Sequence, residues 1–449
     1  MNNDTIAAIA TPSGQGGVGI IRVSGPKAVE LADKISGLCP APRYAHYGAF
    51  VDQNKKTIDS GLTLFFKKPF SFTGEDVVEF HAHGGPVVLD ILLKEILQYD
   101  VRPAHAGEFT ERAYLNDKID LAQAEAIADL IAADSEQAAR AAIRSMQGEF
   151  SAVILLLVEE LIQLRIYVES ALDFPEEEID FLADEAVAKK LEEVKQKLQD
   201  VNKSAQQGRL LKEGMTVVIA GKPNAGKSSL LNLLAGQDSA IVTDVPGTTR
   251  DILREHIQID GLPLHIIDTA GLRDSDDIVE QEGVKRAKQM IEAADQVLFV
   301  VDINDKDLSM MDSLPKNVGR TIVYNKIDKI NHPAKIINNP EAAINHETDI
   351  YLSAKTGEGV ELLKKHLKNT MGYKQKSEGQ FIARRRHLDA IDTAEQHLSL
   401  ADKSLHELKA GELLAEELRF AQEALSSITG EFSSDDLLGR IFADFCIGK

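Results

Sequence analysis

Apolar and polar positions divide the chain of 449 residues into regions of different periodicity. Over residues 1–118, short apolar and partly β-branched runs such as Thr5–Ala10 and Gly19–Ser24 predict strands. The apolar positions of Pro86–Gln98 recur instead at helical spacing. Strands mixed with a helix predict an α+β domain in this region.

Helical periodicity dominates residues 119–213 and 376–449. Between Leu121 and Leu172 the apolar residues keep the spacing of a long helix, and a charged second helix is expected over Asp184–Leu198. Two later series keep alternate spacings of three and four: Ile391, Ala394, Leu398, Ala401, Leu405 and Leu408, then Leu414, Leu418, Ala421, Leu425 and Ile428. Such faces pack against other helices, either within the chain or between chains. The two regions therefore predict one all-α domain in two parts.

Between these helical parts, residues 214–375 alternate strand and helix. Strands are expected at Thr216–Ala220, Leu253–Ile259, Leu264–Asp268, Gln296–Asp302, Arg320–Asn325 and Asp349–Ser353. This alternation predicts an α/β domain with a doubly wound sheet. Because helical segments lie on both sides, we expect this domain to be inserted in a loop of the helical domain.

Composition and charge limit the partners. The 50 Lys and Arg residues against 71 Asp and Glu give a net charge of −21, which repels phosphate backbones over most of the surface. A nucleic acid would need a local basic patch or the help of a partner. The longest apolar run, Ala152–Val158, is too short to cross a bilayer, and Asn2–Asp4 differs from the basic start of a signal peptide. We expect a cytoplasmic protein without a membrane partner, whose cysteines, Cys39 and Cys446, form no disulfide framework.

A glycine-rich loop follows the first expected strand of the α/β region. Gly221–Ser228 reads GKPNAGKS and matches the GxxxxGKS pattern of a P-loop. Its backbone N–H groups and the helix N-terminus bind phosphates, Lys227 neutralises β/γ-phosphate oxygens, and Ser228 is placed to bind Mg²⁺. The expected nucleotide contacts here are Asn224, Ala225, Gly226, Lys227, Ser228 and Ser229.

Three further motifs end later strands of the same region. They supply the expected contacts Asp268, Thr269, Ala270, Gly271, Asn325, Lys326, Asp328, Ser353, Ala354 and Lys355. Asp268 can reach Mg²⁺ through water, and the Gly271 amide can meet the γ-phosphate. Asp328 can accept two hydrogen bonds from the guanine edge, which adenine cannot offer. The sequence therefore predicts a site for a guanine nucleotide.

Together these motifs resemble those of the translation-factor-like (TRAFAC) GTPases. Residues 243–251, TDVPGTTRD, resemble the switch I segment of that class. The resemblance implies that Thr249 is the second protein ligand of Mg²⁺ beside Ser228. It also implies nucleotide contacts from Thr243, Asp244, Val245, Pro246, Gly247, Thr248 and Thr249.

The residue that orients water in Ras-type GTPases is replaced here. A Gln stands just after the corresponding motif in Ras, whereas this chain has Leu272, which cannot orient water. Acidic residues follow, and each is either a solvated side chain or a catalytic group: Asp274, Asp276, Asp277, Glu280 and Glu282. Asn224 resembles its counterpart in potassium-activated GTPases, which implies K⁺ held by Asn224 and by carbonyls of Thr243, Val245 and Thr248. Such a cation would act like an arginine finger.

Several longer sequence segments indicate a particular protein family. The chain resembles the MnmE (TrmE) family of tRNA-modification GTPases over essentially its whole length. The strings are residues 11–12 and 16–25, 72–76 (FTGED), 83–86 (HGGP), 107–110 (GEFT), 115–121 (LNDKIDL), 173–175 (DFP) and 445–449 (FCIGK).

This resemblance implies several assignments. Glu280 would be the catalytic carboxylate that orients water, and a folate-type one-carbon carrier (a tetrahydrofolate derivative) would bind Arg22, Glu79, Lys118 and Lys449. Cys446 matches a C-terminal cysteine of the family, without an assigned role. Residues 1–118 would form a homodimer, and a flavoprotein, MnmG (GidA), would bring FAD and assemble with this chain as a heterotetramer. The two proteins would add an aminomethyl or carboxymethylaminomethyl group to C5 of the wobble uridine of certain tRNAs.

Other interpretations of the sequence are possible at three places. A regulatory GTPase switch in ribosome assembly is the alternative function, but such proteins carry an RNA-binding appendage, and no basic, aromatic-rich signal is evident here. The pattern Gly14-x-Gly16-x-x-Gly19 leads into a strand and not a helix, which argues against a dinucleotide site. Residues 384–387, RRRH, favour a solvated helix face, with tRNA phosphates as the other interpretation.

Overall fold

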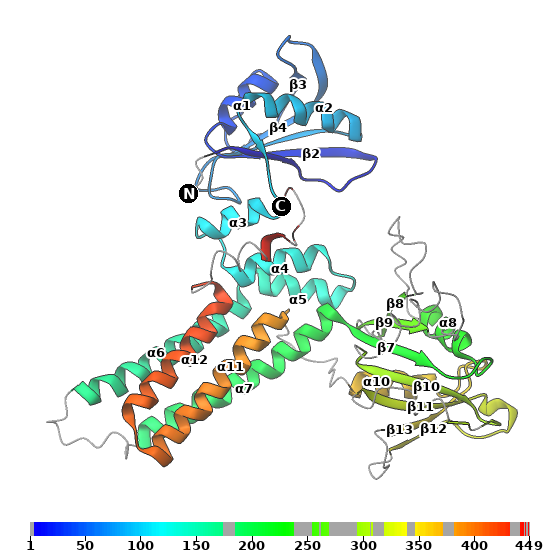
Figure 1. The fold of residues 1–449 in the computed structure, drawn as a ribbon. Helices are drawn as coiled ribbons and strands as arrows, with labels where there is room; N and C mark the ends of the chain where they lie inside the picture. Colours follow the sequence, from blue (N-terminus) through cyan, green and yellow to red (C-terminus); the bar gives the residue numbers. More distant parts are fainter. Residues whose placement is uncertain are drawn as a thin grey trace, which may run out of the picture. The chain divides into compact units, whose positions relative to one another are not determined.

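The computed structural model describes residues 4–173, 185–237, 254–259, 262–268, 294–305, 307–308, 318–338, 346–370, 381–431, 441–443, 445 and 448. They belong to two compact units, shown in Figure 1. The first unit comprises Met1–Ala128, Arg144–Gln196 and Ala390–Lys449, and the second comprises Asp129–Ile143 and Lys197–Asp389. The domain boundaries expected at residues 118, 213 and 375 stay predictions.

The N-terminal part of the first unit is a sheet with helices on it. Among the described residues its strands run in the order β3 (His46–Val51), β4 (Thr57–Phe66), β5 (Val77–Gly84), β2 (Gly16–Ser24), β1 (Ile6–Ile9) and β6 (Arg102–Pro103). Neighbours are antiparallel except β1 and β6. Helices α1 (Ala28–Ser36) and α2 (Pro86–Ile96) cover one face (Figure 1). The predicted α+β architecture is confirmed.

Alternation along the strands sets the two faces of this sheet. Ile21 of β2 is fully buried and packs with Leu92 of α2. Ala8 of β1 belongs to a separate cluster with Phe109, which comes from α3 (Glu108–Leu115). Because successive side chains of a strand point to opposite faces, helices are needed on both sides to cover the apolar positions.

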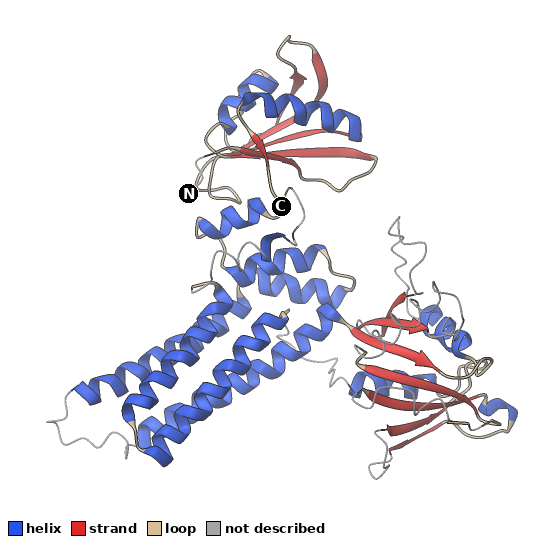
Figure 2. Cartoon of the chain, viewed as in Figure 1, coloured by secondary structure: helices blue, strands red, loops and turns tan. Residues whose placement is uncertain are grey.

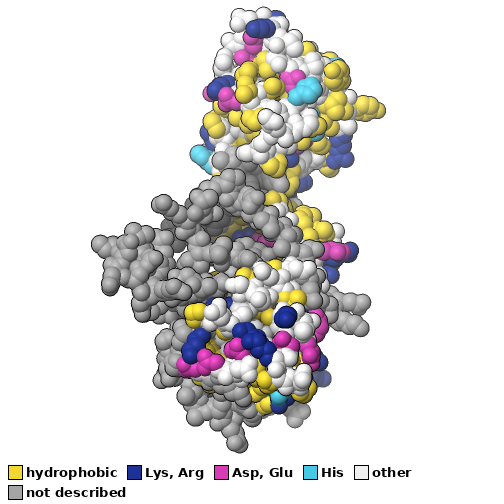
Figure 3. All heavy atoms as spheres, turned by 90° about the vertical axis from the view of Figure 1, so that its right-hand side faces the viewer, with side chains coloured by type: hydrophobic (Ala, Val, Ile, Leu, Met, Phe, Trp, Pro, Cys, Tyr) yellow, Lys and Arg dark blue, Asp and Glu magenta, His cyan; other side chains and the backbone are white. Residues whose placement is uncertain are grey.

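Some apolar side chains of the N-terminal domain face solvent. Tyr44, Tyr47, Phe70 and Val87 are 73%, 70%, 71% and 71% exposed. Figure 3 shows apolar side chains on one face of this domain. Large exposed apolar side chains that gather on a surface are typical of contact with another protein.

Two arginines join distant segments of the N-terminal domain. Arg112 is 7% exposed and pairs with Asp4 (2.7 Å), Glu75 (3.1 Å) and Glu108 (3.0 Å). Arg102 pairs with Asp4 and Glu108 as well. Burial alone would raise the pKa of Glu108, but hydrogen bonds from Arg102 and Arg112 hold this pKa below its ordinary value. The network fastens α3 to the start of the chain and to the FTGED segment.

The helical parts consist of six helices among the described residues. They are α4 (Leu121–Ile131), α5 (Glu136–Met146), α6 (Glu149–Asp173), α7 (Glu185–Glu213), α11 (Arg385–Lys403) and α12 (Gly411–Thr429), blue in Figure 2. The expectation of one long helix over Leu121–Leu172 was wrong, because the helix breaks after Ile131 and again at Gly148, which takes a left-handed φ of 88° between α5 and α6. The helix expected over Asp184–Leu198 continues to Glu213.

The predicted apolar series of the C-terminal region are buried within the chain. Members of the series from Ile391 to Leu405 and from Leu414 to Ile428 are at most 1% exposed. Leu408 is the exception: it is 61% exposed, because α11 ends at Lys403 and a π-helical turn follows it. Helix α12 packs along α6, so packing inside the chain accounts for the second series.

A buried carboxylate joins the two places where the chain crosses between helices and the P-loop domain. Asp129 of α4 is bound by Lys212, near the end of α7, at 3.0 Å and by Arg384, just before α11, at 2.8 Å. Its side chain is 4% exposed. Arg384 is therefore held in an ion pair, and His387 is 2% exposed, so the expected solvated face of residues 384–387 was wrong at these two positions.

The P-loop domain is built on a second sheet. Among the described residues the order is β12 (Lys335–Asn338), β13 (His346–Tyr351), β11 (Gly319–Asn325), β10 (Gln296–Asp302), β7 (Met215–Ala220), β9 (Leu262–Asp268) and β8 (Arg254–Ile259). The strands from β13 to β9 are parallel, and the edge strands β12 and β8 are antiparallel. The predicted α/β sheet is confirmed, and β12 was not foreseen.

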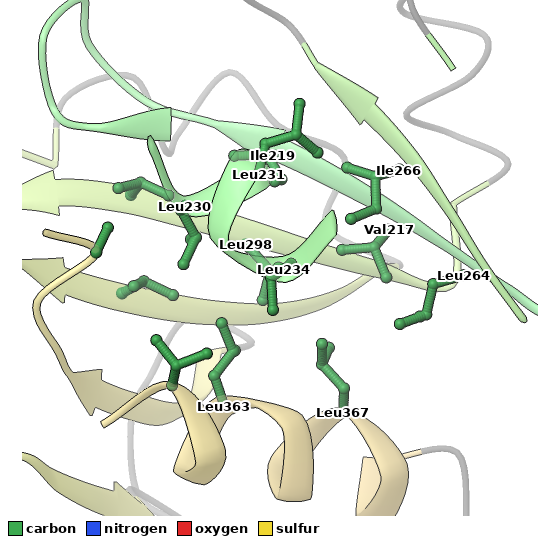
Figure 4. Packing of buried hydrophobic residues seen from close by; sticks show 14 of the residues in the cluster. Val217, Ile219, Leu230, Leu231, Leu234, Leu264, Ile266, Leu298, Leu363 and Leu367 are labelled. Carbon is green, nitrogen blue, oxygen red and sulfur yellow. The ribbon is translucent and has the colours of Figure 1, made fainter. Parts of the chain in front are cut away.

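Helices α8 (Lys227–Gln237) and α10 (Val360–Thr370) bury apolar residues against this sheet. Figure 4 shows Leu230 and Leu234 of α8 with Leu363 of α10 beside strand residues such as Val217, and all four are at most 1% exposed. This packing fixes the start of α8 at the end of β7. None of the described helices is long and apolar enough to cross a membrane.

Candidate functional site

The P-loop lies at the carboxyl end of β7, an interior strand of the sheet. Its turn needs backbone conformations that most residues avoid: φ is 137° at Gly221, 64° at Asn224 and 99° at Gly226. Glycine adopts such angles freely and asparagine tolerates the left-handed region. A Cβ atom at Gly226 would overlap the side-chain amide of Asn325. The glycine pattern of the sequence therefore has a direct steric cause.

The lysine of the P-loop points back over its own loop. Lys227 Nζ donates to the carbonyl oxygens of Gly221 (2.8 Å) and Lys222 (3.0 Å), and the residue is 8% exposed. Ser228 and Ser229 follow in the first turn of α8 and are exposed. A helix N-terminus beside an ammonium group gives a positive potential suited to phosphate.

Asn325 connects three of the four predicted motifs. Its Nδ2 donates to the carbonyl oxygen of Ala225 at 2.9 Å. Its Oδ1 accepts from the backbone amides of Lys326 (2.8 Å) and Ala354 (2.9 Å). At 2% exposure, this residue is a buried amide with donor and acceptor both satisfied. The P-loop, residues 325–328 and residues 353–355 are thus brought to one place.

Asp328, the carboxylate predicted to recognise guanine, is oriented by its neighbour Ser353. Ser353 Oγ donates to Asp328 Oδ1 at 2.6 Å, and Ser353 is fully buried. Ser353 Oγ also accepts from the amide of Thr356 at 3.2 Å. A carboxylate held in this way keeps acceptor capacity for a ligand with two adjacent N–H donors. Lys355 is exposed beside it.

Strand β10 contributes a residue that the sequence analysis did not include. Asp302, the last residue of β10, lies 2.8 Å from Lys326 Nζ, and the same ammonium donates to the carbonyl oxygen of Asn224 at 2.5 Å. Its position in the sequence could have identified it, because Asp302 ends a predicted parallel strand and the other predicted site residues also lie at the ends of such strands.

Several predicted site residues lie outside the described residues. These are Thr243, Asp244, Val245, Pro246, Gly247, Thr248, Thr249, Thr269, Ala270, Gly271, Glu280, Cys446 and Lys449. The backbone of Asp268 ends β9 next to β7, as expected from the sequence. Of the predicted Mg²⁺ ligands the structure therefore describes Ser228, and of the predicted K⁺ ligands it describes Asn224. The predicted water-orienting residue, Glu280, lies outside the described residues.

In the N-terminal domain, the structure joins two of the predicted folate-binding residues. Arg22 Nε donates to Glu79 Oε1 at 2.9 Å, and Arg22 Nη1 lies 3.4 Å from the carbonyl oxygen of Gly448. His81 Nε2 is 3.1 Å from the other Glu79 oxygen. Burial raises the pKa of Glu79, but His81 and Arg22 outweigh it and hold the pKa below its ordinary value. Lys118 Nζ instead donates to the carbonyl oxygen of Pro69.

Comparison with known proteins covers the whole chain. A family model described as MnmE helical domain matches residues 121–446, and one described as GTP-binding protein TrmE N-terminus matches residues 5–118. The tRNA modification GTPase MnmE of Vibrio cholerae serotype O1 is 58% identical over 458 residues, which cover 100% of both chains. The chain belongs to the MnmE family. A second member, from Hydrogenovibrio crunogenus, is 57% identical over 100% of this chain and 99% of its own.

Membership in the MnmE family confirms the resemblance drawn from the sequence strings and makes the chain a GTPase. Among solved structures, Era of Aquifex aeolicus bound to GDP and AlF₄⁻ is 28% identical where it aligns. That alignment covers 41% of this chain and 67% of Era, with a TM-score of 0.27. The MnmE assignment comes from the full-length relatives.

Proposed function

We propose that this chain hydrolyses GTP at the P-loop site and that hydrolysis drives the modification of tRNA. The product would be an aminomethyl or carboxymethylaminomethyl group at C5 of the wobble uridine. The observation that carries the proposal is the bonding of Asn325, which unites the P-loop with both guanine motifs. The names of the full-length relatives support the choice of tRNA.

For hydrolysis, we propose Mg²⁺ bound by Ser228 and Thr249, with Asp268 acting through water. K⁺ would be held by Asn224 and by carbonyls of Thr243, Val245 and Thr248. Exposed Asn224, fixed in a left-handed turn, supplies the hard oxygen ligand that such a cation takes. Bound cations supply positive charge at the phosphates, and Glu280 would orient the attacking water.

For the modification chemistry, we propose that a folate-type carrier binds Arg22, Glu79, Lys118 and Lys449. A folate carries carboxylates, which guanidinium and ammonium groups bind well. The Arg22–Glu79 pair next to Gly448 supports this choice, because the terminal Lys449 follows Gly448 directly.

We propose partners for this chain as well. The exposed apolar residues of the N-terminal domain support a homodimer through residues 1–118. The flavoprotein MnmG would supply FAD chemistry in a heterotetramer, and the cytoplasm is the compartment where tRNA and these partners meet. The strong negative charge supports a tRNA bound with the help of this partner.

The cation proposal predicts that hydrolysis depends on K⁺. We expect GTP hydrolysis on the order of tenfold or more faster in KCl than in NaCl at equal ionic strength, because K⁺ stabilises the developing phosphate charge. Phosphate release would be measured for the full chain and for Asn224→Ser, which should lose most of the difference. Equal rates of the unmodified chain in both salts would contradict this assignment.

The tRNA proposal predicts the loss of one nucleoside. In cells that lack the chain, or that carry Asp328→Asn or Glu280→Ala, mass spectrometry of tRNA should show no C5-modified wobble uridine. Arg140→Ala, at an exposed position of α5, is the matched control and should keep it. Unchanged wobble uridine in the deletion would discard the proposal. Ribosome assembly would then be tested by GTP-dependent co-sedimentation with ribosomal subunits.

A further inference from the structure

Asp302 at the end of β10 lies outside the four motifs of the nucleotide site, yet both of its oxygens are engaged. Oδ2 is 2.8 Å from Lys326 Nζ and 3.8 Å from Lys329 Nζ. Oδ1 accepts from the backbone amide of Asn304 at 3.1 Å and from its side-chain amide at 3.3 Å. The loop after β10 therefore fixes the carboxylate, and the carboxylate in turn fixes Lys326.

Lys326 carries this restraint to the P-loop. Lys326 directly follows the buried Asn325, and its backbone takes a left-handed φ of 69°. Its side chain is 24% exposed. From there the ammonium donates to the carbonyl oxygen of Asn224 at 2.5 Å. Asn224 is itself in a left-handed conformation, so its side-chain direction depends on how its backbone is held.

The charge of Asp302 is kept at neutral pH. Burial raises the pKa of the carboxyl group, but the hydrogen bonds from Lys326 and from the Asn304 amide, with the nearby charges of Lys326 and Lys329, bring the pKa below its ordinary value. A charge-assisted bond of this kind is stronger than a neutral one and orients the ammonium more tightly.

We propose that Asp302 is a positioning residue of the GTPase site. It holds the Lys326 ammonium on the Asn224 carbonyl, and so it fixes the guanine-recognition residues 325–328 and the proposed K⁺ ligand Asn224 relative to each other. The inference rests on the proposed function in one respect, the assignment of K⁺ to Asn224. Loss of the carboxylate charge frees the Lys326 side chain, whose stem would lie over the guanine base in the proposed site, and leaves the Asn224 carbonyl without its fixed donor. Nucleotide affinity and potassium dependence should therefore change together.

A second ion pair, between the loop after β10 and Lys222 of the P-loop, provides the control. Lys222 pairs with Asp307 at 2.6 Å and with Asp305 at 3.3 Å. The side chain of Asp305 is 64% exposed, and a pair at such a position contributes little. Asp305→Asn removes the same charge three residues from Asp302 without touching Lys326.

The test compares Asp302→Asn, Asp302→Glu and Asp305→Asn in the full-length chain. The first measurement is the Kd for fluorescent GDP in NaCl, which needs neither K⁺ nor tRNA. The second is the K⁺ concentration for half-maximal GTP hydrolysis. For Asp302→Asn we expect a Kd raised about tenfold and a half-maximal K⁺ concentration raised several-fold. Asp302→Glu should recover part of both, and Asp305→Asn should stay within about twofold of the unmodified chain.

Asp302→Asn and Asp305→Asn with the same Kd and the same K⁺ requirement would overturn the proposal. A double variant separates positioning from general damage: with Lys326→Ala in place, adding Asp302→Asn should change the Kd for GDP no further. Additive effects of the two substitutions would also overturn it. Absence of K⁺ stimulation in the unmodified chain would remove the cation assignment alone, since the GDP measurements still decide the role of Asp302.

Discussion

Replacing Gly226 by alanine should nearly abolish guanine-nucleotide binding. Gly226 has a φ of 99°, and a Cβ atom there would overlap the Nδ2 atom of Asn325. The substitution thus adds backbone strain and displaces the amide that joins Ala225, Lys326 and Ala354. Strain together with a buried amide left unsatisfied should weaken GDP binding about 100-fold or more.

A glycine in the last turn of α8 offers the matched control. Gly236 lies in α8, and a Cβ atom there meets open space. Gly236→Ala should leave GDP binding unchanged and stabilise the helix by roughly 0.5–1 kcal/mol. Titration calorimetry with GDP on both variants measures the difference. An unchanged affinity of Gly226→Ala for GDP would mean that the hydrogen bonds of Asn325 do not organise the nucleotide site.

Replacing Arg112 by alanine should loosen the N-terminal domain. The substitution leaves Glu108 and its neighbours without the guanidinium that joins them, in a place where Arg112 is 7% exposed. Breaking a buried ion pair by removing one partner costs about 3–5 kcal/mol. Amide hydrogen exchange of β1, β2 and α3 in the full-length chain measures the loss, because other domains unfold separately.

Arg140 provides the comparison for an exposed pair. It lies one helical turn from Glu136, and the two side chains are 70% and 76% exposed. Such a pair contributes about 0.5 kcal/mol or less, so Arg140→Ala should leave exchange in the N-terminal domain unaltered. Equal exchange in Arg112→Ala and in the unmodified chain would show that the network carries no stability.

The nucleotide site was largely predictable because parallel strands end at one edge of a sheet. Once the sequence placed motifs after the strands that end at Ala220, Asp268 and Asn325, their proximity followed. The bonds of Asn325 were not predictable, since they depend on the exact turn of the P-loop. Strand β12 was missed because a short edge strand, Lys335–Asn338, has little alternation to identify it.

The N-terminal domain shows what sequence motifs alone cannot predict. FTGED and GEFT carried the family resemblance, yet no spacing indicates that Glu75 and Glu108 share an arginine with Asp4. Residues that lie far apart in sequence pair only after the sheet has brought their segments together. The solvated interpretation of Arg384 was wrong for the same reason, because its partner, Asp129, precedes it by 255 residues.

The bond of Asp129 to both Lys212 and Arg384 bears on how such a chain could arise. The chain enters and leaves the P-loop domain beside one carboxylate, that of Asp129. The end of α7 and the residue before α11 are therefore as close together as the two ends of a tight turn. A gene for a helical protein could acquire a complete nucleotide-binding module at such a place in a single event, without widening the gap between the helices. The same carboxylate holds the end of α7 beside the residue that precedes α11, where the chain enters and leaves the P-loop domain.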